Sequence, residues 1–233
     1  MTTFLVTGAN KGLGLETARQ LVAAGHKVWL GSRDADLGRA AAAEVGALPV
    51  QLDVTDDASV AAAVETVAAA GGLDVLVNNA GIQAEMDGNG VAAGAADLTA
   101  DMMQATLDTN VVGVVRVLHA FLPLLEKSAA PVVVNVSSGL GSLARAASPA
   151  NAYAGVAYPA SKAALNMITI RYAKAFPAMR INAVAPGFTR TALNHNTGTQ
   201  SVEDGGRVIV GLALLGPDGP TGGYFDATGP VAW

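Results

Sequence analysis

Residues 3–14 read TFLVTGANKGLG, a short apolar run that leads into a glycine-rich turn. The run predicts a strand, and Leu13–Ala24, which stops at Gly25, predicts a helix directly after the turn. Glycines in such a turn let the backbone approach a pyrophosphate, whose charge is attracted to the free N–H groups at the helix start. The spacing is GxxxGxG instead of the general GxGxxG. Its place between a strand and a helix nevertheless predicts dinucleotide binding.

Short apolar runs alternate with longer Ala-rich stretches along the rest of the chain. The expected strands are Thr3–Thr7, Lys27–Ser32, Leu48–Asp53, Leu73–Asn78, Pro131–Ser137 and Met179–Val184, with a short one near Tyr224. This alternation indicates βαβ units, and strands that are apolar on both sides indicate a parallel sheet covered on both faces. The sequence therefore predicts a single α/β domain over residues 1–233, a Rossmann-type doubly wound parallel sheet of about seven strands.

Capping residues and glycines predict the element boundaries. A helix is expected over Asp56–Ala70, with Thr55 as its cap and two glycines as its stop. Two stretches without periodicity are expected to be loops that can move, Glu85–Gly94 and Asn194–Thr199.

The charge content excludes nucleic acid as a partner. Charged residues make up 14% of the chain, against roughly 25% in an average domain, and the net charge is −5. The 14 Lys and Arg residues are scattered, so no basic binding surface is expected. A weakly charged surface favours a compact enzyme, and it is consistent with apolar contacts in a homo-oligomer such as a dimer or tetramer.

Membrane, metal and disulfide chemistry are not expected. The apolar stretch Val111–Leu125 is interrupted by Arg116 and His119 and is shorter than the ~20 residues of a membrane span, so it predicts a buried helix. No signal-like segment precedes the first strand, which predicts a cytoplasmic protein. There is no cysteine, and the three histidines lack metal-binding spacing.

The end of the second strand indicates which dinucleotide is bound. An NAD-binding protein usually has an acidic residue there, on the ribose 2′-hydroxyl, but this chain has Ser32 and Arg33. A hydroxyl and a guanidinium suit a 2′-phosphate, and Lys11 in the first turn adds a second cation. These residues favour NADP(H), although Arg33 can also be interpreted as a solvated charge beside Asp34.

Further motifs follow the glycine turn in a fixed order. They are Asp53, Asn78-Asn79-Ala80-Gly81, Asn110, Ser138, Tyr158-Pro159-Ala160-Ser161-Lys162, and Pro186-Gly187 with Thr191. In this order they resemble the short-chain dehydrogenase/reductase family, on its carbonyl-reductase side. The resemblance implies a catalytic set of Asn110, Ser138, Tyr158 and Lys162, in which the asparagine orders a water. The implied cofactor-binding set is Gly8, Asn10, Lys11, Gly12, Leu13, Gly14, Ser32, Arg33, Asp53, Val54, Asn79, Ala80, Gly81, Tyr158, Lys162, Pro186, Gly187, Phe188 and Thr191.

The chemistry of Tyr158 and Lys162 also follows from their spacing. Residues four apart share one helix face, so the Lys162 ammonium is expected near the Tyr158 phenol, lowering its pKa from about 10. While the cofactor gives hydride to a carbonyl carbon, Tyr158 would protonate the oxygen and Ser138 would hydrogen-bond it. Without the other motifs, the same spacing would indicate only a surface pair.

Two neighbouring residues compete for these roles. Ser137 precedes Ser138, but strand alternation sends it to the opposite face. Tyr153 has Ala157, not a lysine, four residues on. The stretch from Ser138 to Tyr158 is longer than in many family members, which makes residues 140–156 an added segment.

The substrate site is expected at the carboxyl ends of the strands. Its walls should come from Ile82–Gly94, Leu140–Val156 and Phe188–Thr199. These offer the apolar residues Ile82, Leu140, Leu143, Tyr153, Phe188 and Leu193, and the charges Glu85, Asp87, Arg145 and Arg190. Such walls favour a small neutral ketone or aldehyde. Tyr153 is a candidate for selecting the ketone face, with loop packing as its alternative role.

Two other functions fit the sequence less well. An NADP-dependent alcohol or steroid dehydrogenase would use the same residues in the oxidative direction. A non-catalytic cofactor sensor would keep the fold, but such proteins typically lose the tyrosine or lysine, and this chain has both. Enoyl reduction is disfavoured by the Tyr-to-Lys spacing.

Overall fold

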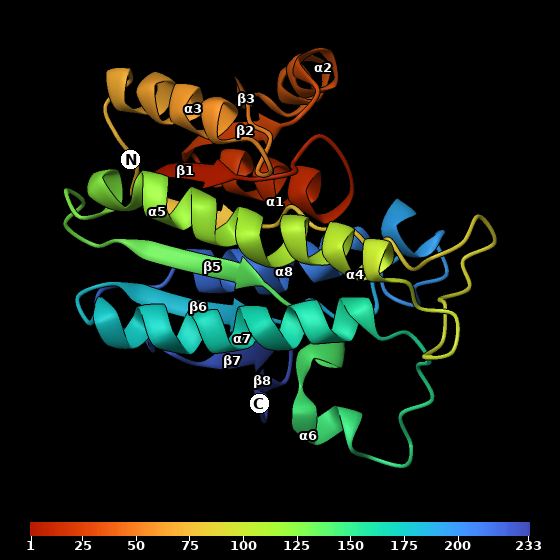
Figure 1. The fold of residues 1–233 in the computed structure, drawn as a ribbon. Helices are drawn as coiled ribbons and strands as arrows, with labels where there is room; N and C mark the ends of the chain where they lie inside the picture. The colour runs from red at the N-terminus through yellow and green to blue at the C-terminus, as the bar shows by residue number, and fades with distance from the viewer.

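The computed structural model describes residues 1–233 and contains one sheet with helices on both faces (Figure 1). The strand order is β3-β2-β1-β4-β5-β6-β7-β8, and all neighbours are parallel except β7 and β8. The order reverses beside β1, which confirms the predicted doubly wound sheet. The strands are β1 Thr3–Val6, β2 Lys27–Ser32, β3 Leu48–Gln51, β4 Val75–Asn78, β5 Val132–Val136, β6 Arg180–Val184, β7 Tyr224–Asp226 and β8 Gly229–Pro230. The two-residue strand β8 was not expected.

Each face of the sheet has its own helices. One face is covered by α1 (Gly12–Ala23), α2 (Ala35–Val45) and α8 (Val202–Ala213). The other is covered by α3 (Asp57–Ala69), α4 (Ala100–Leu107), α5 (Gly113–Leu125) and α7 (Ala157–Ala175). In Figure 1, α5 and α7 lie in front of the sheet, and α1 and α8 lie behind it. Four shorter helical segments are η1 (Asp108–Val112), η2 (Gly139–Gly141), α6 (Leu143–Ala146) and η3 (Ala192–Asn194).

Alternation along the strands divides the core between the two faces. Leu5 of β1 packs in one buried cluster with Phe121 of α5 and Leu165 of α7. Its neighbours Phe4 and Val6 belong to the other cluster, with residues of α1, α2 and α8. Because both faces are covered, the strands are mostly apolar, as is typical of a buried parallel sheet.

The elements α4, η1 and α5 form one continuous helix, Ala100–Leu125. It is longer than the expected buried helix Val111–Leu125, and by length and composition alone it could cross a membrane. A core helix of a globular domain meets the same criterion, and Phe121 and Leu125 are fully buried in the core. The helix is therefore weak evidence for a membrane span, and the expected absence of one stays a prediction.

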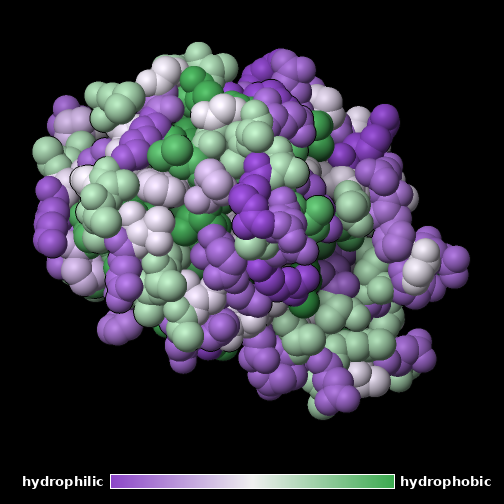
Figure 2. Space-filling model, turned by 90° about the horizontal axis from the view of Figure 1, so that it is seen from above, coloured by the Kyte–Doolittle hydropathy of each residue, from purple (hydrophilic) through white to green (hydrophobic).

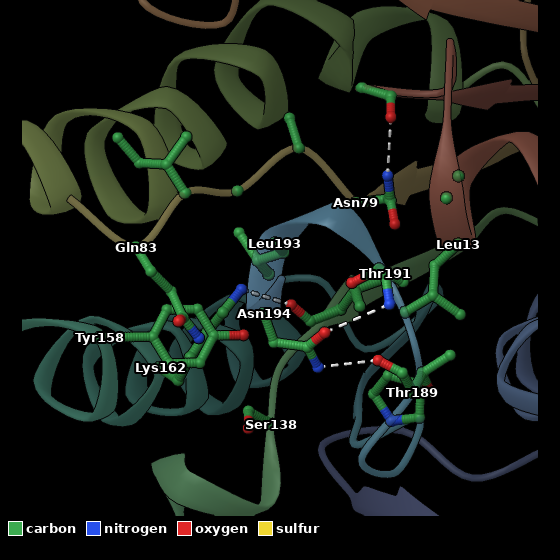
Figure 3. A pocket seen from close by; sticks show the side chains of 18 of the residues that line it. Leu13, Asn79, Gln83, Ser138, Tyr158, Lys162, Thr189, Thr191, Leu193 and Asn194 are labelled. Atoms are coloured by element: carbon green, nitrogen blue, oxygen red, sulfur yellow. Dashed lines mark hydrogen bonds between the residues drawn. The ribbon is translucent and has the colours of Figure 1, made fainter. Parts of the chain in front are cut away.

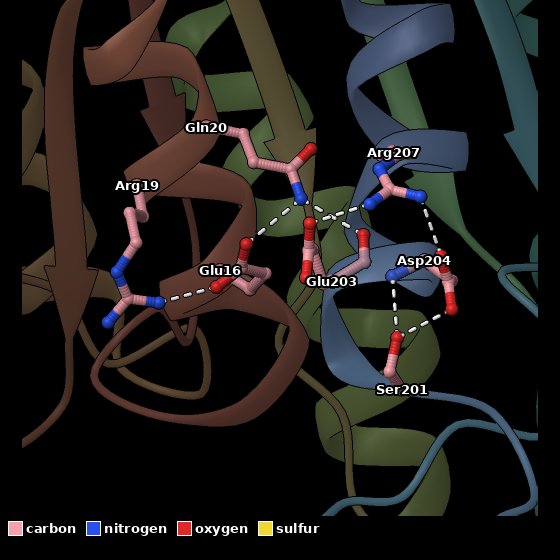
Figure 4. A network of polar contacts seen from close by, with 7 residues as sticks. All are labelled: Glu16, Arg19, Gln20, Ser201, Glu203, Asp204 and Arg207. Carbon is pink, nitrogen blue, oxygen red and sulfur yellow. Dashed lines mark hydrogen bonds and ion pairs between the residues drawn. The ribbon is translucent and has the colours of Figure 1, made fainter.

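Close packing of α8 holds α1 against the sheet (Figure 4). A Cβ on Gly206 would lie 2.9 Å from Gln20 Nε2 and 3.0 Å from Glu16 Cγ, so the glycine favours this close approach. Gln20 donates to Glu16 Oε1 (2.9 Å) and to the Glu203 carbonyl (3.0 Å), which links the two helices. These contacts are made by the side of α1, and the N–H groups of its first turn take no part in them.

Most strands are one to two residues shorter than expected, and other differences concern a helix cap and the loops. Asp56, not Thr55, caps α3, because its carboxylate accepts from the Ala58 N–H at 3.0 Å. The expected loop Glu85–Gly94 is closed on itself by a single antiparallel bridge between Met86 and Ala92. The second expected loop is correct except that Asn194 ends η3.

The surface that Figure 2 shows is a mixture of polar and apolar areas. Seen from the side of α2 and α3, hydrophilic areas alternate with white and green areas of intermediate and apolar hydropathy (Figure 2). This face therefore offers no single extensive apolar surface.

Candidate active site

A cavity of about 1010 Å³ opens at the carboxyl ends of the strands. Its walls are the segments after β1 to β6 together with the start of α7. Doubly wound sheets bind ligands at this edge, and typical ligand pockets measure roughly 300–1,000 Å³. The cavity is thus large enough for a dinucleotide-sized ligand. All predicted site residues line it except Ser32 and Asn110.

Three glycines shape the turn after β1. Gly8 and Gly12 have φ values of 61° and 57°, in the left-handed region that other residues rarely adopt. A Cβ on Gly14 would lie 2.7 Å from the Gly8 carbonyl oxygen, so the turn excludes a side chain there. The helix α1 starts after Lys11 without a side-chain cap. Its first N–H groups, which face the cavity, are therefore free to bind an anion.

Asn79 ties the turn after β4 to the turn after β1. Its Nδ2 donates to the carbonyls of Thr7 (2.9 Å) and Gly8 (3.1 Å). The Thr7 hydroxyl accepts from the N–H groups of Asn79 and Ala80, each at 3.0 Å. The motif that contains Asn79, Ala80 and Gly81 therefore shapes the glycine turn as well as lining the cavity.

Two unpaired cations stand where the turns after the neighbouring strands β1 and β2 meet. Lys11 and Arg33 are exposed, line the cavity and take part in none of the ion pairs of the chain. Ser32 corrects the prediction: it is buried, and its hydroxyl donates to the Asp34 carbonyl at 2.7 Å. That hydroxyl is already used as a donor, so the charged side-chain donors here are Arg33 and Lys11.

Asp53 and Val54 line the same end of the cavity, after β3. One oxygen of the Asp53 carboxylate, Oδ1, accepts from the N–H (2.9 Å) and the hydroxyl (2.7 Å) of Thr55. These two bonds hold the carboxylate in place and leave Oδ2 available to a ligand.

Tyr158, Lys162 and Ser138 meet at the other end of the cavity (Figure 3). The first two come from the start of α7, and Ser138 follows β5. Lys162 Nζ lies 5.4 Å from the centre of the Tyr158 ring and donates to the Val136 carbonyl at 2.8 Å. Ser138 lies close enough to the Tyr158 hydroxyl to influence its pKa. The structure thus brings together the three residues that the spacing and the motifs predict.

Burial governs the proton affinity of both titratable groups. It raises the pKa of Tyr158 well above its usual value, opposed by hydrogen bonding to Ser138 and Gln83. Burial also lowers the pKa of Lys162 to about 8. The expected lowering of the Tyr158 pKa by Lys162 is therefore wrong for the protein by itself, because loss of solvation outweighs it. Tyr158 keeps its proton, which is the state that a proton donor needs.

Asn110 lies just behind the cavity, in the π-helical turn η1. It is fully buried, accepts from the Ile82 N–H (2.8 Å) and donates to the Ile82 carbonyl (2.9 Å) and to Ser161 Oγ (3.0 Å). A Cβ added to Gly81 would lie 3.3 Å from Asn110 Oδ1 and 3.6 Å from Lys162 Nζ, so both side chains lie close to Gly81. π-Helical turns are frequent at functional sites. Here the Asn110 side chain holds the loop after β4 beside Lys162.

Ser137 and Ser138 both line the cavity, so the expected placement of Ser137 on the opposite face is wrong, but the two residues have different partners. The Ser137 hydroxyl is buried and donates to Asn166 Oδ1 at 2.6 Å, so it is occupied. The Ser138 carbonyl accepts a hydrogen bond from the Tyr224 hydroxyl, and Tyr224 stacks on Trp233 with ring centres 5.2 Å apart. Nothing local in the sequence marked Tyr224 as a support for Ser138.

The segment after β6 forms the wall opposite the glycine turn. Pro186, Gly187, Phe188 and Thr191 line the cavity, as expected. Gly187 has a φ of 96°, which favours glycine, and the Gln200 side chain donates to the Pro186 carbonyl at 2.6 Å. Asn194 accepts from the Thr191 N–H (3.2 Å) and donates to the Thr189 carbonyl (2.8 Å), which folds the segment on itself (Figure 3).

The expected substrate walls are largely correct, with corrections among the charges. The lining includes Ile82, Leu140, Tyr153, Phe188 and Leu193. Leu143 is exposed outside the cavity. Of the four expected charges, only Arg145 lines it, and Arg145 pairs with Asp226 at 2.8 Å. Glu85 is instead buried behind the wall, and Asp87 and Arg190 lie outside it.

Two polar groups on the substrate side lack partners. The Tyr153 hydroxyl and Gln83 Oε1 are both buried without a hydrogen bond, and both residues line the cavity near Tyr158. Burial raises the pKa of Tyr153 to about 12, and the nearby Glu85 charge adds to this, so its hydroxyl is protonated. Gln83 was not predicted, although its place two residues after Gly81 was a usable signal.

Comparison with known proteins assigns the family. Residues 2–201 match the model of the family described as short chain dehydrogenase. The chain is also 35% identical to (+)-neomenthol dehydrogenase from Arabidopsis thaliana, in an alignment that covers 95% of this chain and 94% of that protein. The chain belongs to the short-chain dehydrogenase family.

Solved structures of reductases have the same architecture as this short-chain dehydrogenase. Salutaridine reductase from Papaver somniferum matches with a TM-score of 0.85 and 28% identity, over 97% of this chain and 100% of that one. NADPH-bound carbonyl reductase from chicken fatty liver matches with a TM-score of 0.86 and 28% identity, over 100% and 99%. The chain is therefore an oxidoreductase with carbonyl-reductase-like relatives.

Proposed function

We propose that this short-chain dehydrogenase is an NADPH-dependent reductase of small neutral ketones or aldehydes, with Tyr158 as the proton donor. One observation carries the proposal. A buried, protonated phenol lies with Ser138 at one end of a cavity, while the other end has a glycine turn, a helix start without a cap and two unpaired cations. The first end fits a carbonyl group, and the second fits a phosphorylated dinucleotide.

The residues around the cavity fit NADPH. The tight turn at Gly8, Gly12 and Gly14 leaves room for a pyrophosphate against the start of α1. Lys11 and Arg33 would hold the 2′-phosphate, because both are unpaired and Arg offers several donors to phosphate oxygens. By family resemblance, Asp53 would contact the adenine, Lys162 the nicotinamide ribose, and the Pro186–Thr191 segment the carboxamide. When bound, NADPH supplies a hydride for the carbonyl carbon.

The reaction needs a proton at the carbonyl oxygen, and Tyr158 holds one. Its raised pKa keeps the phenol protonated throughout the physiological range. A substrate oxygen between Tyr158 and Ser138 would accept a hydrogen bond from each hydroxyl, which stabilises the negative charge that develops there. Transfer of the Tyr158 proton to this oxygen completes the alcohol.

The substrate class follows from the cavity walls. The substrate side includes the apolar residues Ile82, Leu140, Phe188 and Leu193, and apart from the catalytic Lys162 its lining arginine, Arg145, is paired with Asp226. An ionised substrate would lose its solvation there without gaining a free opposite charge. A neutral ketone or aldehyde avoids this loss.

A second candidate function is the oxidation of an alcohol with NADP+. The relative named (+)-neomenthol dehydrogenase favours it, because that name describes the oxidative direction. The protonated state of Tyr158 favours reduction, since oxidation needs a phenolate to accept the proton. A cofactor sensor without turnover is disfavoured, because Ser138, Tyr158 and Lys162 are all present and assembled.

The test is NADPH oxidation by the purified protein with a panel of ketones, aldehydes, quinones and diketones, repeated with NADH. We expect turnover of neutral compounds with NADPH. A strict preference for anionic keto acids would contradict the substrate proposal. Absence of turnover in reduction, together with alcohol oxidation at neutral pH, would favour the second candidate.

Tyr153 is proposed to select the face of the ketone that meets the cofactor. We expect Tyr153→Ala to change the enantiomeric excess in the reduction of an aryl ketone. Unchanged selectivity and unchanged KM would show that Tyr153 only packs the added segment.

A further inference from the structure

We propose that Glu85 is a positioning residue whose carboxylate fixes the start of α7 and thereby places the Tyr158 hydroxyl. Glu85 comes from the loop after β4 and does not line the cavity, so it contacts neither the cofactor site nor the substrate site. Its effect on turnover rests on the proposed reductase function, whereas its effect on the backbone of α7 does not.

The Glu85 carboxylate accepts three hydrogen bonds from the first N–H groups of α7. Oε2 accepts from Val156 (2.9 Å) and Ala157 (2.5 Å), and Oε1 accepts from Tyr158 (2.9 Å). The third of these donors is the backbone of the proposed proton donor itself. Bonds from N–H groups to a charged oxygen are about twice as strong as neutral ones. A single side chain therefore fixes the backbone position of Tyr158.

No local residue performs this function. Val156 occupies the N-cap position of α7 and offers no side-chain acceptor, whereas Asp34, Asp56, Thr99 and Ser201 cap their helices from the adjacent position. Glu85 is 2% exposed and forms no ion pair with Lys, Arg or His. The three N–H groups and the positive end of the helix are thus the groups that compensate its buried charge.

Gly155 makes room for the arrangement. A Cβ at this position would lie 2.7 Å from Glu85 Oε1 and 2.8 Å from the Tyr153 hydroxyl oxygen. The added segment therefore enters α7 through a residue without a side chain, packed between Tyr153 and Glu85. The same contact connects the substrate wall to the start of α7.

The loop that carries Glu85 is itself anchored beside Lys162. Asn110 binds both the N–H and the carbonyl of Ile82, three residues before Glu85. The chain from Gly81 to Glu85 is therefore fixed at Ile82 and at Glu85, and it spans the distance between Lys162 and Tyr158. Since a misplacement of about 1 Å in an active site can cost about 100-fold in rate, loss of the Glu85 bonds should act on turnover.

The test is Glu85→Gln, which keeps the size of the side chain. A glutamine has one acceptor oxygen, and its NH₂ group faces N–H donors, so at least one of the three bonds is lost. We expect kcat for ketone reduction to fall by about 10- to 100-fold, where the upper value is the loss typical of a misplacement of about 1 Å. The Kd for NADPH, measured by fluorescence, should stay near that of wild type. Hydrogen exchange at the amides of Val156, Ala157 and Tyr158 should become faster.

Asp87→Asn is the matched control. Asp87 lies in the same loop and also accepts backbone N–H groups, from Asn89 (2.9 Å) and Val91 (2.8 Å), but it is exposed and does not contact α7. We expect this variant to keep the wild-type kcat and the wild-type exchange at residues 156–158.

Wild-type kcat in folded Glu85→Gln, or an equal loss of kcat in Asp87→Asn, would overturn the proposal. If Glu85→Gln does not fold, Gly155→Ala decides in the same assays, because its Cβ would overlap Glu85 Oε1 and displace the carboxylate without removing it. Lowered kcat with unchanged Kd supports the proposal, and wild-type kcat overturns it. If wild type reduces no carbonyl compound, the proposed function fails, and the exchange of the three amides alone decides whether Glu85 fixes α7.

Discussion

The start of α1 and the start of α7 both lack a local side-chain cap, but they differ in what replaces it. The N–H groups of α1 face the cavity after a glycine turn and have no acceptor in the protein. Those of α7 are occupied by the Glu85 carboxylate. The remaining longer helices that begin after a loop have a capping side chain next to them.

This difference indicates that the two helix starts have different functions, one in ligand binding and the other in positioning a catalytic residue. A helix start with free N–H groups attracts an anion, so α1 is suited to a phosphate ligand. A helix start that already holds a carboxylate cannot bind a second anion, so α7 is suited to fixed geometry. The cofactor phosphates therefore belong at α1, and the proton transfer belongs at α7.

The largest expected effect comes from removing the hydroxyl at α7. We predict that Tyr158→Phe lowers kcat by about 10²–10⁴-fold, the range for a positioned proton donor, while the Kd for NADPH stays near wild type. Steady-state kinetics and a fluorescence titration measure the two values. Tyr172→Phe, on the same helix and outside the cavity, is the control and should be fully active. Retention of more than about a tenth of kcat would show that Tyr158 is not the donor.

A methyl group at the first residue of α1 should weaken the binding of NADPH instead of slowing the reaction. Gly12→Ala adds a Cβ at a φ of 57° on the cavity side, 3.6 Å from Thr191. We predict at least a tenfold rise in the Kd for NADPH, equivalent to ~1.4 kcal/mol. Gly25→Ala at the other end of α1 is the control, because it has a similar strain at a φ of 83° but open space around it. Equal effects of both variants would mean that strain alone, and not contact with the cofactor, explains the loss.

A smaller effect is expected from the charge beside the glycine turn. We predict that NADPH is preferred over NADH by about tenfold or more in kcat/KM, which corresponds to ~1.4 kcal/mol. Arg33→Ala should raise KM for NADPH and barely change it for NADH. Arg39→Ala, which removes an exposed arginine paired with Asp36, should leave both unchanged. If Arg33→Ala affects both cofactors alike, Arg33 does not recognise the 2′-phosphate.

The pH dependence should report on Lys162. Its pKa of about 8 lies below the usual value, so the ammonium form is lost as the pH rises through about 8. We predict that kcat/KM for NADPH, which reports the free enzyme, falls above this pH. The free energy of unfolding should instead rise over this range. Between a pH of about 8 and the ordinary lysine pKa, the unfolded chain binds more protons than the folded protein. A flat kcat/KM from pH 7 to 9.5 would exclude an essential Lys162 ammonium.

Local chemistry explains which parts of the site could be predicted from the sequence. The glycine turn is recognisable because its backbone angles and close contacts require glycine, and Tyr158 and Lys162 share a helix face by spacing alone. The role of Glu85 was missed, since its partners lie 71 to 73 residues away and no periodicity links them. The roles of Ser32 and the pKa of Tyr158 were misjudged because both depend on burial, which only the folded chain sets.

The most direct test of the division between the two helix starts is a crystal structure of the protein with NADPH. We predict that the pyrophosphate binds at the N–H groups of Gly12 and Leu13, with the 2′-phosphate between Lys11 and Arg33. Glu85 should remain on the N–H groups of Val156 to Tyr158. A pyrophosphate bound away from α1, or a Glu85 side chain released from α7 in the complex, would contradict the account.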